Sequence, residues 1–422
     1  MHRWDSSKNG ILIVTKAKDN RLVLFTRQLV EWLLFTPDFV KKFPFAVYVD
    51  AHLRISGKFG YDDLTKTSPI WKSQVKFWTP KLCYEQPNLF DLIITLGGDG
   101  TLLFAASMFQ SKVPPIMPFH LGTFGFLTPF LFTTYQAQLN KLFEGNLETV
   151  NRMRICCTVY RLSSSFRVKQ QAHDRHTSTI HYRSFNHSTE WEILEFDSPQ
   201  SGQNDRNHAE KPNNIQYHTV AQEVYHVLNE VVVDRGPSSN MALLELFGDD
   251  KHLTTVQADG LCIATATGST AYSVSIRIAV PFSSRYTAFC SFDGRNRIEL
   301  KRGDHIKVTA SLYSVQTFSC QSVSDDWFNS IQNSLQWNVR PYAETSTGSN
   351  NKMANADKTI KQSCSTVSHS TSEESMSEKD HAAISNYRQL CKGSDEESEF
   401  DLMPWTEEET QRHTFVTKES KI

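Results

Sequence analysis

The 422-residue sequence predicts two domains of different class, a parallel α/β domain followed by a β-rich domain. Short unbroken apolar runs alternate with an amphipathic helical pattern in the first third of the chain. From about residue 152 the pattern changes to short strands separated by turns. In the first part a glycine-rich turn also joins an apolar run to a helix, which is the order of a ligand site in an open α/β sheet.

The first domain is predicted to span residues 11–135, after an N-terminal tail of residues 1–10. Leucine and phenylalanine recur at helical spacing over residues 22–34 and predict an amphipathic helix. Apolar runs without alternation predict buried strands at residues 11–15, 45–50 and 92–96. Strands that alternate with helices favour a parallel sheet.

The second domain is predicted to span residues 136–325 and to be rich in β-strands. Its strand patterns are residues 155–160, 227–234, 243–247 and 261–265. A stretch rich in Ser, His, Gln and Asn, residues 163–217, is interpreted as a long flexible insertion. Residues 326–340 are expected to pack back on the first domain. Residues 341–422, rich in Ser, Thr, Glu and Lys, are expected to form a disordered tail.

Composition favours small-molecule partners. The 44 basic and 46 acidic residues give a formal net charge of -2, so no overall field draws the protein to nucleic acid or to an anionic membrane. Eight cysteines show no CxxC pair and no zinc-ligand spacing. No apolar stretch approaches the roughly 20 residues that span a bilayer. We therefore expect no nucleic-acid or membrane binding and a cytoplasmic location.

The turn GGDGT at residues 97–101 is the most informative motif. Glycines let a backbone approach a bound group closely, and the amides at the start of the following helix favour an anion, such as a phosphate. The carboxylate of Asp99 would repel that phosphate unless it takes a proton from an attacking hydroxyl or holds a metal ion. The turn therefore indicates phosphoryl transfer, with a purely structural turn as the alternative.

Two further clusters indicate a nucleoside pocket. Residues 259–273 combine Asp259, a strand and a loop dense in hydroxyls and small side chains, which suit ribose hydroxyls, a flat ring and phosphate or purine edges. The alternative is a Ser/Thr-rich turn without a ligand. Residues 228–236 place Asn229 and Glu230 at the edge of a strand. A second glycine cluster, residues 121–127, is also expected at a strand end.

Taken together, these motifs resemble the ATP-dependent NAD kinases, which convert NAD to NADP, and the eukaryotic, fungal-like members above all. The resemblance runs from about residue 9 to residue 340. The GGDG turn is shared with diacylglycerol-type lipid kinases and phosphofructokinase, whereas the TGSTAYS and NEV segments are not. Besides GGDGT, its strongest parts are FHLGTFGFLTPF at 119–130, LNEVVVDRGPSS at 228–239, VQADGLCIATATGSTAYS at 256–273, SFDGRNR at 291–297 and LQWN at 335–338.

The resemblance implies a Rossmann-like N-terminal domain, a β-sandwich-like C-terminal domain and NAD in the cleft between them. It implies that Asp99 is the catalytic carboxylate, which takes the proton of the adenosine ribose 2′-hydroxyl as that oxygen attacks the γ-phosphorus of ATP. Gly98 and Gly100 would contact phosphates, and Asn229 and Glu230 would lie near the ribose and nicotinamide of NAD.

The resemblance implies further nucleotide contacts in the second domain. Asp259 would be a second ribose or carboxamide contact. The loop that follows contains two further expected binding residues, Thr267 and Ser269. The residues expected to line the adenine pocket are Thr270, Ala271, Tyr272 and Ser275. Mg²⁺ is expected on the ATP phosphates rather than on dedicated protein ligands. Family members form homo-oligomers.

The chain departs from the family pattern after Ser275. The glycine-containing helix, the His-Pro and the following strand motifs of the family are absent, and Ile276 begins a strand that the family has several dozen residues later. Ala266 stands where the family usually has proline. An internal deletion would expose strand edges, each unsatisfied buried backbone group costing about 1 to 3 kcal/mol. The alternatives to an active NAD kinase are therefore an impaired or non-catalytic isoform and, less favoured, a lipid kinase.

Overall fold

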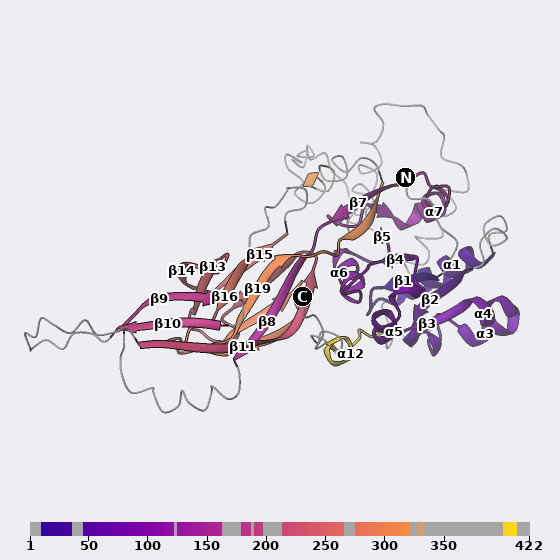
Figure 1. Cartoon of the computed structure of the whole chain (residues 1–422). Coiled ribbons are helices and arrows are strands. Elements are labelled where there is room, and N and C mark those ends of the chain that lie inside the picture. Colours follow the sequence, from indigo (N-terminus) through magenta and orange to yellow (C-terminus); the bar gives the residue numbers. More distant parts are fainter. Residues whose placement is uncertain are drawn as a thin grey trace, which may run out of the picture.

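The chain folds into an α/β domain and a β-rich domain that lie next to each other (Figure 1). The computed structural model describes residues 10–35, 45–121, 125–162, 179–186, 190–196, 213–265, 275–320, 328, 331–332 and 400–411. Side chains are described for the same residues except 179–186, 190–196, 213–218 and 411. No helix of this part of the chain is long and apolar enough to span a membrane.

The first domain is built on a sheet with the order β3-β2-β1-β4-β5-β20-β7, in which β6 also pairs with β5. Neighbours from β3 to β20 are parallel, whereas β7 is antiparallel to β20. The strands are β1 (Gly10–Thr15), β2 (Ala46–Asp50), β3 (Val75–Trp78), β4 (Leu92–Leu96), β5 (Ile116–His120), β6 (Phe130–Leu131), β7 (Glu148–Arg152) and β20 (Val315–Ser319).

Helices cover both faces of this sheet. Alternate residues of β1 enter different apolar clusters, Ile11 and Ile13 on one face and Leu12 and Val14 on the other. Strands buried on both faces explain the unbroken apolar runs in the sequence. The helices and 3₁₀ turns are α1 (Asn20–Phe35), η1 (Ala51–Arg54), α3 (Tyr61–Thr67), α4 (Pro69–Gln74), α5 (Pro80–Glu85), η2 (Pro87–Leu89), α6 (Asp99–Ser107), η3 (Phe132–Thr134) and α7 (Tyr135–Phe143).

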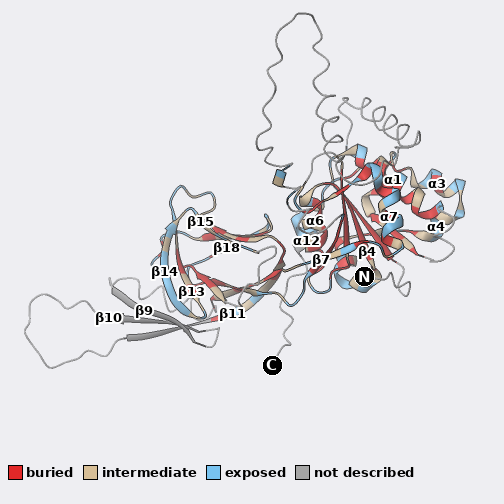
Figure 2. Cartoon of the chain, turned by 90° about the horizontal axis from the view of Figure 1, so that it is seen from above, coloured by how far each residue is buried: buried red, intermediate tan, exposed pale blue. Residues whose placement is uncertain are grey.

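The second domain consists of a closed barrel and a smaller sheet (Figure 2). The barrel order is β10-β11-β8-β19-β16-β13-β14-β9, and the sheet order is β15-β12-β17-β18. The two share one apolar core, in which Cys157 and Val159 of the barrel meet Val231 and Val233 of the sheet. The strands are β8 (Ile155–Leu162), β9 (Thr179–Asn186), β10 (Glu190–Phe196), β11 (Asn213–Val227), β12 (Glu230–Asp234), β13 (Ala242–Gly248), β14 (Lys251–Ala258), β15 (Gly260–Ala264), β16 (Ile276–Ala279), β17 (Ala288–Phe292), β18 (Arg295–Leu300) and β19 (His305–Ala310).

The boundaries differ from the sequence prediction in two places. The predicted flexible insertion, residues 163–217, contains β9, β10 and the first part of β11, which pair with one another in the barrel. Strand-forming residues there lie between polar stretches that dominate the composition, so an average over the segment hides them. Both β7 and β20 belong to the sheet of the first domain, although residues 136–325 were assigned as a whole to the second.

The C-terminal part also differs from its prediction. Residues 400–411 of the predicted disordered tail pack on the first domain and end in α12 (Glu407–Gln411). The segment 326–340, which was expected to fill that role, lies outside the described residues apart from residues 328 and 331–332.

The strand that follows the apparent deletion is paired on both sides. Ile276 of β16 pairs with Gly248 of β13 and with Val308 of β19, both antiparallel. The backbone groups of this strand are therefore satisfied within the barrel. The expected exposure of strand edges does not occur at β16.

Candidate active site

The GGDGT turn lies between the buried strand β4 and helix α6. Gly97 has a positive φ of 156°, and a Cβ there would lie 2.3 Å from the Thr101 Oγ1 atom. Gly98 caps α6 with an extended backbone, and Gly100 is helical. A Cβ on either of these two would meet nothing within 4 Å. The turn is thus tight at Gly97 and open above Gly98 and Gly100, where a ligand has room.

The carboxylate of Asp99 is held by the loop after β5. Its Oδ2 accepts a hydrogen bond from the Phe126 amide at 2.9 Å, and its Oδ1 accepts from the Leu127 amide at 3.0 Å. The Thr128 hydroxyl donates to Oδ1 at 3.2 Å. Three donors therefore fix the side chain that the sequence singled out, at the start of a helix whose free amides favour an anion.

Gly125 makes this contact possible. A Cβ at Gly125 would lie 2.1 Å from the Asp99 Oδ1 atom, which is far inside van der Waals contact. The sequence signal was the second glycine cluster, but its spacing gave no indication that one of these glycines touches Asp99. Residues 122–124 of the cluster lie outside the described residues.

A turn with Asn229 and Glu230 begins β12, and the carboxylate of Asp293 holds it. The amides of Leu228, Asn229 and Glu230 donate to this carboxylate at 2.9, 2.7 and 3.1 Å. The Thr265 amide also donates to the Asn229 carbonyl at 2.8 Å. Asp293 and Gly294 both have positive φ, 49° and 70°, as in the two-residue hairpin turn that favours Asp-Gly. The motif SFDGRNR at residues 291–297 contains Asp293, but the motif alone does not indicate this contact.

The same hairpin and the residue before Asn229 bring this turn to helix α6. Leu228 is buried in one cluster with Leu102 and Ala105 of α6. The Arg295 guanidinium lies 5.1 Å from the centre of the Phe104 ring and donates to the Gly100 carbonyl at 3.4 Å. The elements that carry Asp99 and Asn229 are therefore adjacent.

A buried arginine fixes the two domains where the chain passes between them. Arg154, which is 1% exposed, donates to the carbonyls of Phe109 and Ser111 after α6, each at 2.8 Å. Its Nε donates to the Tyr313 carbonyl at 2.7 Å. Because each donor of a buried charge needs a partner, these bonds lock the crossing strands to the end of α6.

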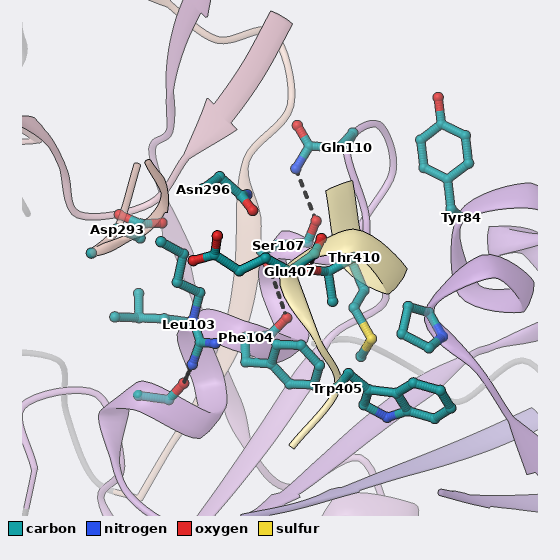
Figure 3. Close-up of a pocket in the computed structure, with 15 residues that line it drawn as sticks. Tyr84, Leu103, Phe104, Ser107, Gln110, Asp293, Asn296, Trp405, Glu407 and Thr410 are labelled. Carbon is teal, nitrogen blue, oxygen red and sulfur yellow. Dashed lines mark hydrogen bonds between the residues drawn. The ribbon is translucent and has the colours of Figure 1, made fainter. Parts of the chain in front are cut away.

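A pocket of about 320 Å³ opens beside the turn (Figure 3). It is lined by Gly100, Phe104 and Ser107 of α6, by the Asp293 hairpin and by the C-terminal segment. Its size lies at the lower end of the range for small-molecule sites. The pocket thus extends the open side of the glycine turn along α6.

Two of the predicted binding residues lie elsewhere. Asp259 precedes the first residue of β15, whereas Glu230 pairs with Ala264, the last residue of that strand. The exposed Asp259 carboxylate accepts a hydrogen bond from Arg235 Nε at 2.8 Å. The Ser275 amide donates to the Asp249 carboxylate at 2.9 Å, and the Ser275 carbonyl accepts from the Asp249 amide at 2.8 Å, at the end of the barrel. The other predicted loop residues lie outside the described residues, namely Thr267, Ser269, Thr270, Ala271 and Tyr272.

Burial shifts several titratable groups around the site. Burial raises the pKa of Glu230, and the negative charge of Asp293 adds to the shift. Burial also raises the pKa of Asp293, against the effect of its three amide donors. Burial lowers the pKa of His120, although the charge of Asp99 opposes it. A lowered pKa favours the neutral imidazole of His120, the last residue of β5.

Two family models match the chain, the ATP-NAD kinase N-terminal domain over residues 11–147 and the ATP-NAD kinase C-terminal domain over residues 228–276. An uncharacterized kinase of Schizosaccharomyces pombe is 32% identical over 368 residues, covering 78% of this chain and 80% of that protein. The chain belongs to the ATP-NAD kinase family. The predicted family is therefore confirmed.

Other fungal members of the ATP-NAD kinase family are also similar. The NAD(+) kinase of Saccharomyces cerevisiae is 35% identical over 376 residues, and an ATP-NADH kinase of the same yeast is 34% identical over 371 residues. Each match covers 80% of this chain but only 61% and 65% of the relatives, so the chain spans less than two thirds of their length.

A solved structure confirms the fold class. The crystal structure of yeast NADH kinase complexed with NADH matches with a TM-score of 0.51 and 20% identity, covering 80% of this chain and 90% of that chain. The Rossmann-like α/β domain and the β-rich domain predicted from the sequence are therefore both present.

Proposed function

We propose that this chain is an NAD kinase, which transfers the γ-phosphoryl group of ATP to the 2′-hydroxyl of the adenosine ribose of NAD and so forms NADP. The observation that carries the proposal is the fixed carboxylate of Asp99 at the start of α6, inside a glycine turn that is open above Gly98 and Gly100. Membership of the family and its named NAD(+) kinase and ATP-NADH kinase relatives support it.

In the proposed reaction the glycine turn binds the ATP phosphates. The amides at the start of α6 and the open backbone at Gly98 and Gly100 provide neutral donors for them. We expect Mg²⁺ to arrive with ATP and to neutralise charge on the phosphate oxygens. Among the described residues no group of three or more His, Cys, Asp or Glu side chains could hold a metal ion.

Asp99 is the proposed proton acceptor. The ribose 2′-oxygen forms a bond to the γ-phosphorus, the bond from that phosphorus to the β-γ bridging oxygen breaks, and ADP leaves. The hydroxyl proton passes to Asp99. The hydrogen bonds from the loop 125–128 hold the carboxylate in one orientation, so that little reorganisation is needed.

Asn229 and Glu230 are the proposed contacts for the ribose and nicotinamide of NAD. The proposed contacts for its adenine are Thr270, Ala271, Tyr272 and Ser275. The turn at Asn229 is rigid, because Asp293 binds its three amides and Thr265 binds its carbonyl. Asp259 is a proposed second ribose or carboxamide contact, at the end of β15 opposite Glu230. We also propose, from the family alone, a homo-oligomer that acts in the cytoplasm.

A second candidate is a catalytically impaired or non-catalytic isoform. The C-terminal family match ends at residue 276, where the sequence departs from the family pattern. This end of the match supports a deletion next to the proposed adenine loop. A lipid kinase is disfavoured, because both ATP-NAD kinase domain models match.

Two measurements on the purified chain separate these functions. The first incubates it with ATP, Mg²⁺ and NAD and detects NADP with an NADP-specific dehydrogenase. The second measures NAD binding by calorimetry without ATP. NADP formation is the expected result. NAD binding without NADP formation would identify the non-catalytic isoform, and the absence of both would overturn the proposal.

A further inference from the structure

The C-terminal segment, residues 400–411, crosses the carboxyl ends of three strands of the first domain. The Leu402 carbonyl accepts from the Lys18 amide after β1 at 2.9 Å. The Trp405 indole donates to the Asp50 carboxylate at the end of β2 at 2.8 Å, and its ring lies 6.0 Å from that of Trp78, which ends β3. Ligands of open α/β sheets bind at this edge, so the segment lies where a ligand of this sheet is expected.

The docking is anchored by buried and charged groups. Leu402 is 1% exposed and belongs to the core of the first domain. The Asp401 carboxylate accepts from the Ser56 hydroxyl at 2.6 Å and from the Lys58 amide at 2.9 Å, and the Asp401 amide donates to Asn20 at 3.0 Å. These hydrogen bonds join residues more than 340 positions apart in the sequence and fix the segment on the first domain.

The segment then turns into the pocket beside the GGDGT turn. Thr406 and Glu409 form a reciprocal capping box, in which the Glu409 amide donates to the Thr406 hydroxyl at 3.3 Å and the Glu409 carboxylate accepts from the Thr406 amide at 2.9 Å. This box fixes the start of α12. Trp405, Glu407 and Thr410 consequently line the pocket, and Glu407 extends toward the hairpin that carries Asp293 and Asn296 (Figure 3).

Glu407 brings a negative charge to the one cation of the pocket. Arg295 is the single basic side chain among the described residues that line it, and its guanidinium reaches Gly100 of the phosphate-binding turn. Partial burial lowers the pKa of Arg295, and the charges of Asp293 and Glu407 oppose that shift. A phosphate that approached Arg295 would meet the carboxylate of Glu407 as well.

We propose that residues 400–411 are a docked competitor of the anionic nucleotide, an autoinhibitory segment that covers the edge of β1 to β3 and places the charge of Glu407 in the same pocket as Arg295. The inference rests on the proposed function, because it takes the ligand of the pocket to be the phosphate portion of ATP. Release of the segment removes the negative charge of Glu407 from the pocket and strengthens nucleotide binding.

A matched pair of charge variants in the full chain tests the competition. Glu407→Gln and Glu408→Gln each remove one negative charge from the same exposed helix, but only Glu407 lines the pocket. The affinity for a non-hydrolysable ATP analogue with Mg²⁺ is measured by calorimetry. We expect Glu407→Gln to tighten binding about two- to fivefold, the size of interactions between exposed charges, and Glu408→Gln to leave it unchanged. Equal affinities for the wild type and both variants, including no binding by any of them, would overturn the proposal.

A docking variant provides a readout that does not depend on activity. Trp405→Ala removes the indole contact with Asp50 and is expected to speed amide hydrogen exchange at Lys18 and Lys58, whose amides donate to the segment. It should also tighten nucleotide binding at least as much as Glu407→Gln. Faster exchange together with weaker nucleotide binding would show a supporting clasp instead of a competitor and would overturn the inference. A chain that binds nucleotide in this way but forms no NADP would leave the inference standing and refute only the proposed function.

Discussion

Strand β1 of the first domain and strand β14 of the second domain differ in how many of their residues are buried. All six residues of β1 are buried, whereas none of the eight residues of β14 is buried, and Leu253 of β14 is 61% exposed. The turn with Asp99 follows β4, in which every residue is buried, whereas the turn with Asn229 begins β12, in which only alternate residues are buried. The second domain is also the one that departs from the family pattern after Ser275. The two turns of the candidate site therefore rest on strands that are buried to different extents.

The link between the Asp293 hairpin and the Asn229 turn is expected to show the largest effect. Asp293→Ala leaves three amides of the Asn229 turn without their acceptor and puts a non-glycine side chain other than Asn or Asp at a φ of 49°. We expect a loss of about 3 to 5 kcal/mol in the unfolding free energy of the second domain, measured by denaturant titration. We also expect a raised KM for NAD.

Asp293→Asn is the matched control for this link. Asn tolerates the left-handed backbone and keeps one acceptor oxygen, so about half of the loss is expected. Equal stability of wild type, Asn and Ala variants would show that the hairpin does not hold the Asn229 turn.

In the first domain the largest loss of activity is expected for Gly125→Ala. Its methyl group would lie 2.1 Å from the Asp99 Oδ1 atom and must displace the carboxylate. We expect turnover to fall about 100-fold, as for a misplaced catalytic group, with NAD binding preserved. Gly57→Ala is a control, since a Cβ there meets nothing within 4 Å. Unchanged turnover in Gly125→Ala would remove the loop from the mechanism.

Restoring the segment that the family has after Ser275 tests the stability of the second domain directly. Insertion of the family segment between Ser275 and Ile276 should cover more of the exposed surface near β14, and we expect the Tm of the second domain to rise by about 5 °C. Differential scanning calorimetry resolves this transition from that of the first domain. Identical melting and turnover with and without the insertion would show that the present architecture is complete.

The smallest expected effect is a pH dependence at the domain interface. Burial lowers the pKa of His226 to about 4, with the charge of Arg154 as the second cause. Between pH 6.5 and about 4 the unfolded chain binds a proton that the folded chain does not, so stability falls as the pH falls through this window. Because His226 is half-buried, we expect a loss of about 1 to 2 kcal/mol.

His226→Gln isolates this contribution, because Gln does not titrate. Stability curves of the two proteins from pH 7 to pH 4 should diverge as the pH falls, with the wild type losing more. Parallel curves would exclude His226 as the titrating group.

Local patterns predicted the parts of the fold that depend on periodicity. Strand β4 is buried on both faces and therefore appears in the sequence as an unbroken apolar run. Helix α1 is buried on one face and therefore shows apolar residues at helical spacing. Strands β9 and β10 were missed because polar neighbours dominate the composition of that stretch. The docked segment around Trp405 was missed because a single Leu and Trp in a polar tail give no periodic signal.

The site was predicted to the extent that each motif carries its own chemistry. Asp99 and Asn229 could be named from sequence because each lies at the end of a strand within a distinct cluster. The residues that hold them could not be named from the sequence. Gly125 lies 26 residues from Asp99 and Asp293 lies 64 residues from Asn229, so that only tertiary folding brings each pair together. Asp259 lies at the far end of β15, because sequence proximity to the loop does not fix which end of a strand faces the cleft.

The central claim is that the carboxylate at the start of α6 accepts the proton of the ribose hydroxyl during phosphoryl transfer. The most direct measurement compares wild type and Asp99→Asn in a single turnover with ATP labelled at the γ-phosphate and saturating NAD. We predict that the wild type moves the label to the 2′-position of NAD, and that Asp99→Asn binds NAD equally well but transfers label at least about 100-fold more slowly. Equal rates of transfer by the two proteins would contradict the account.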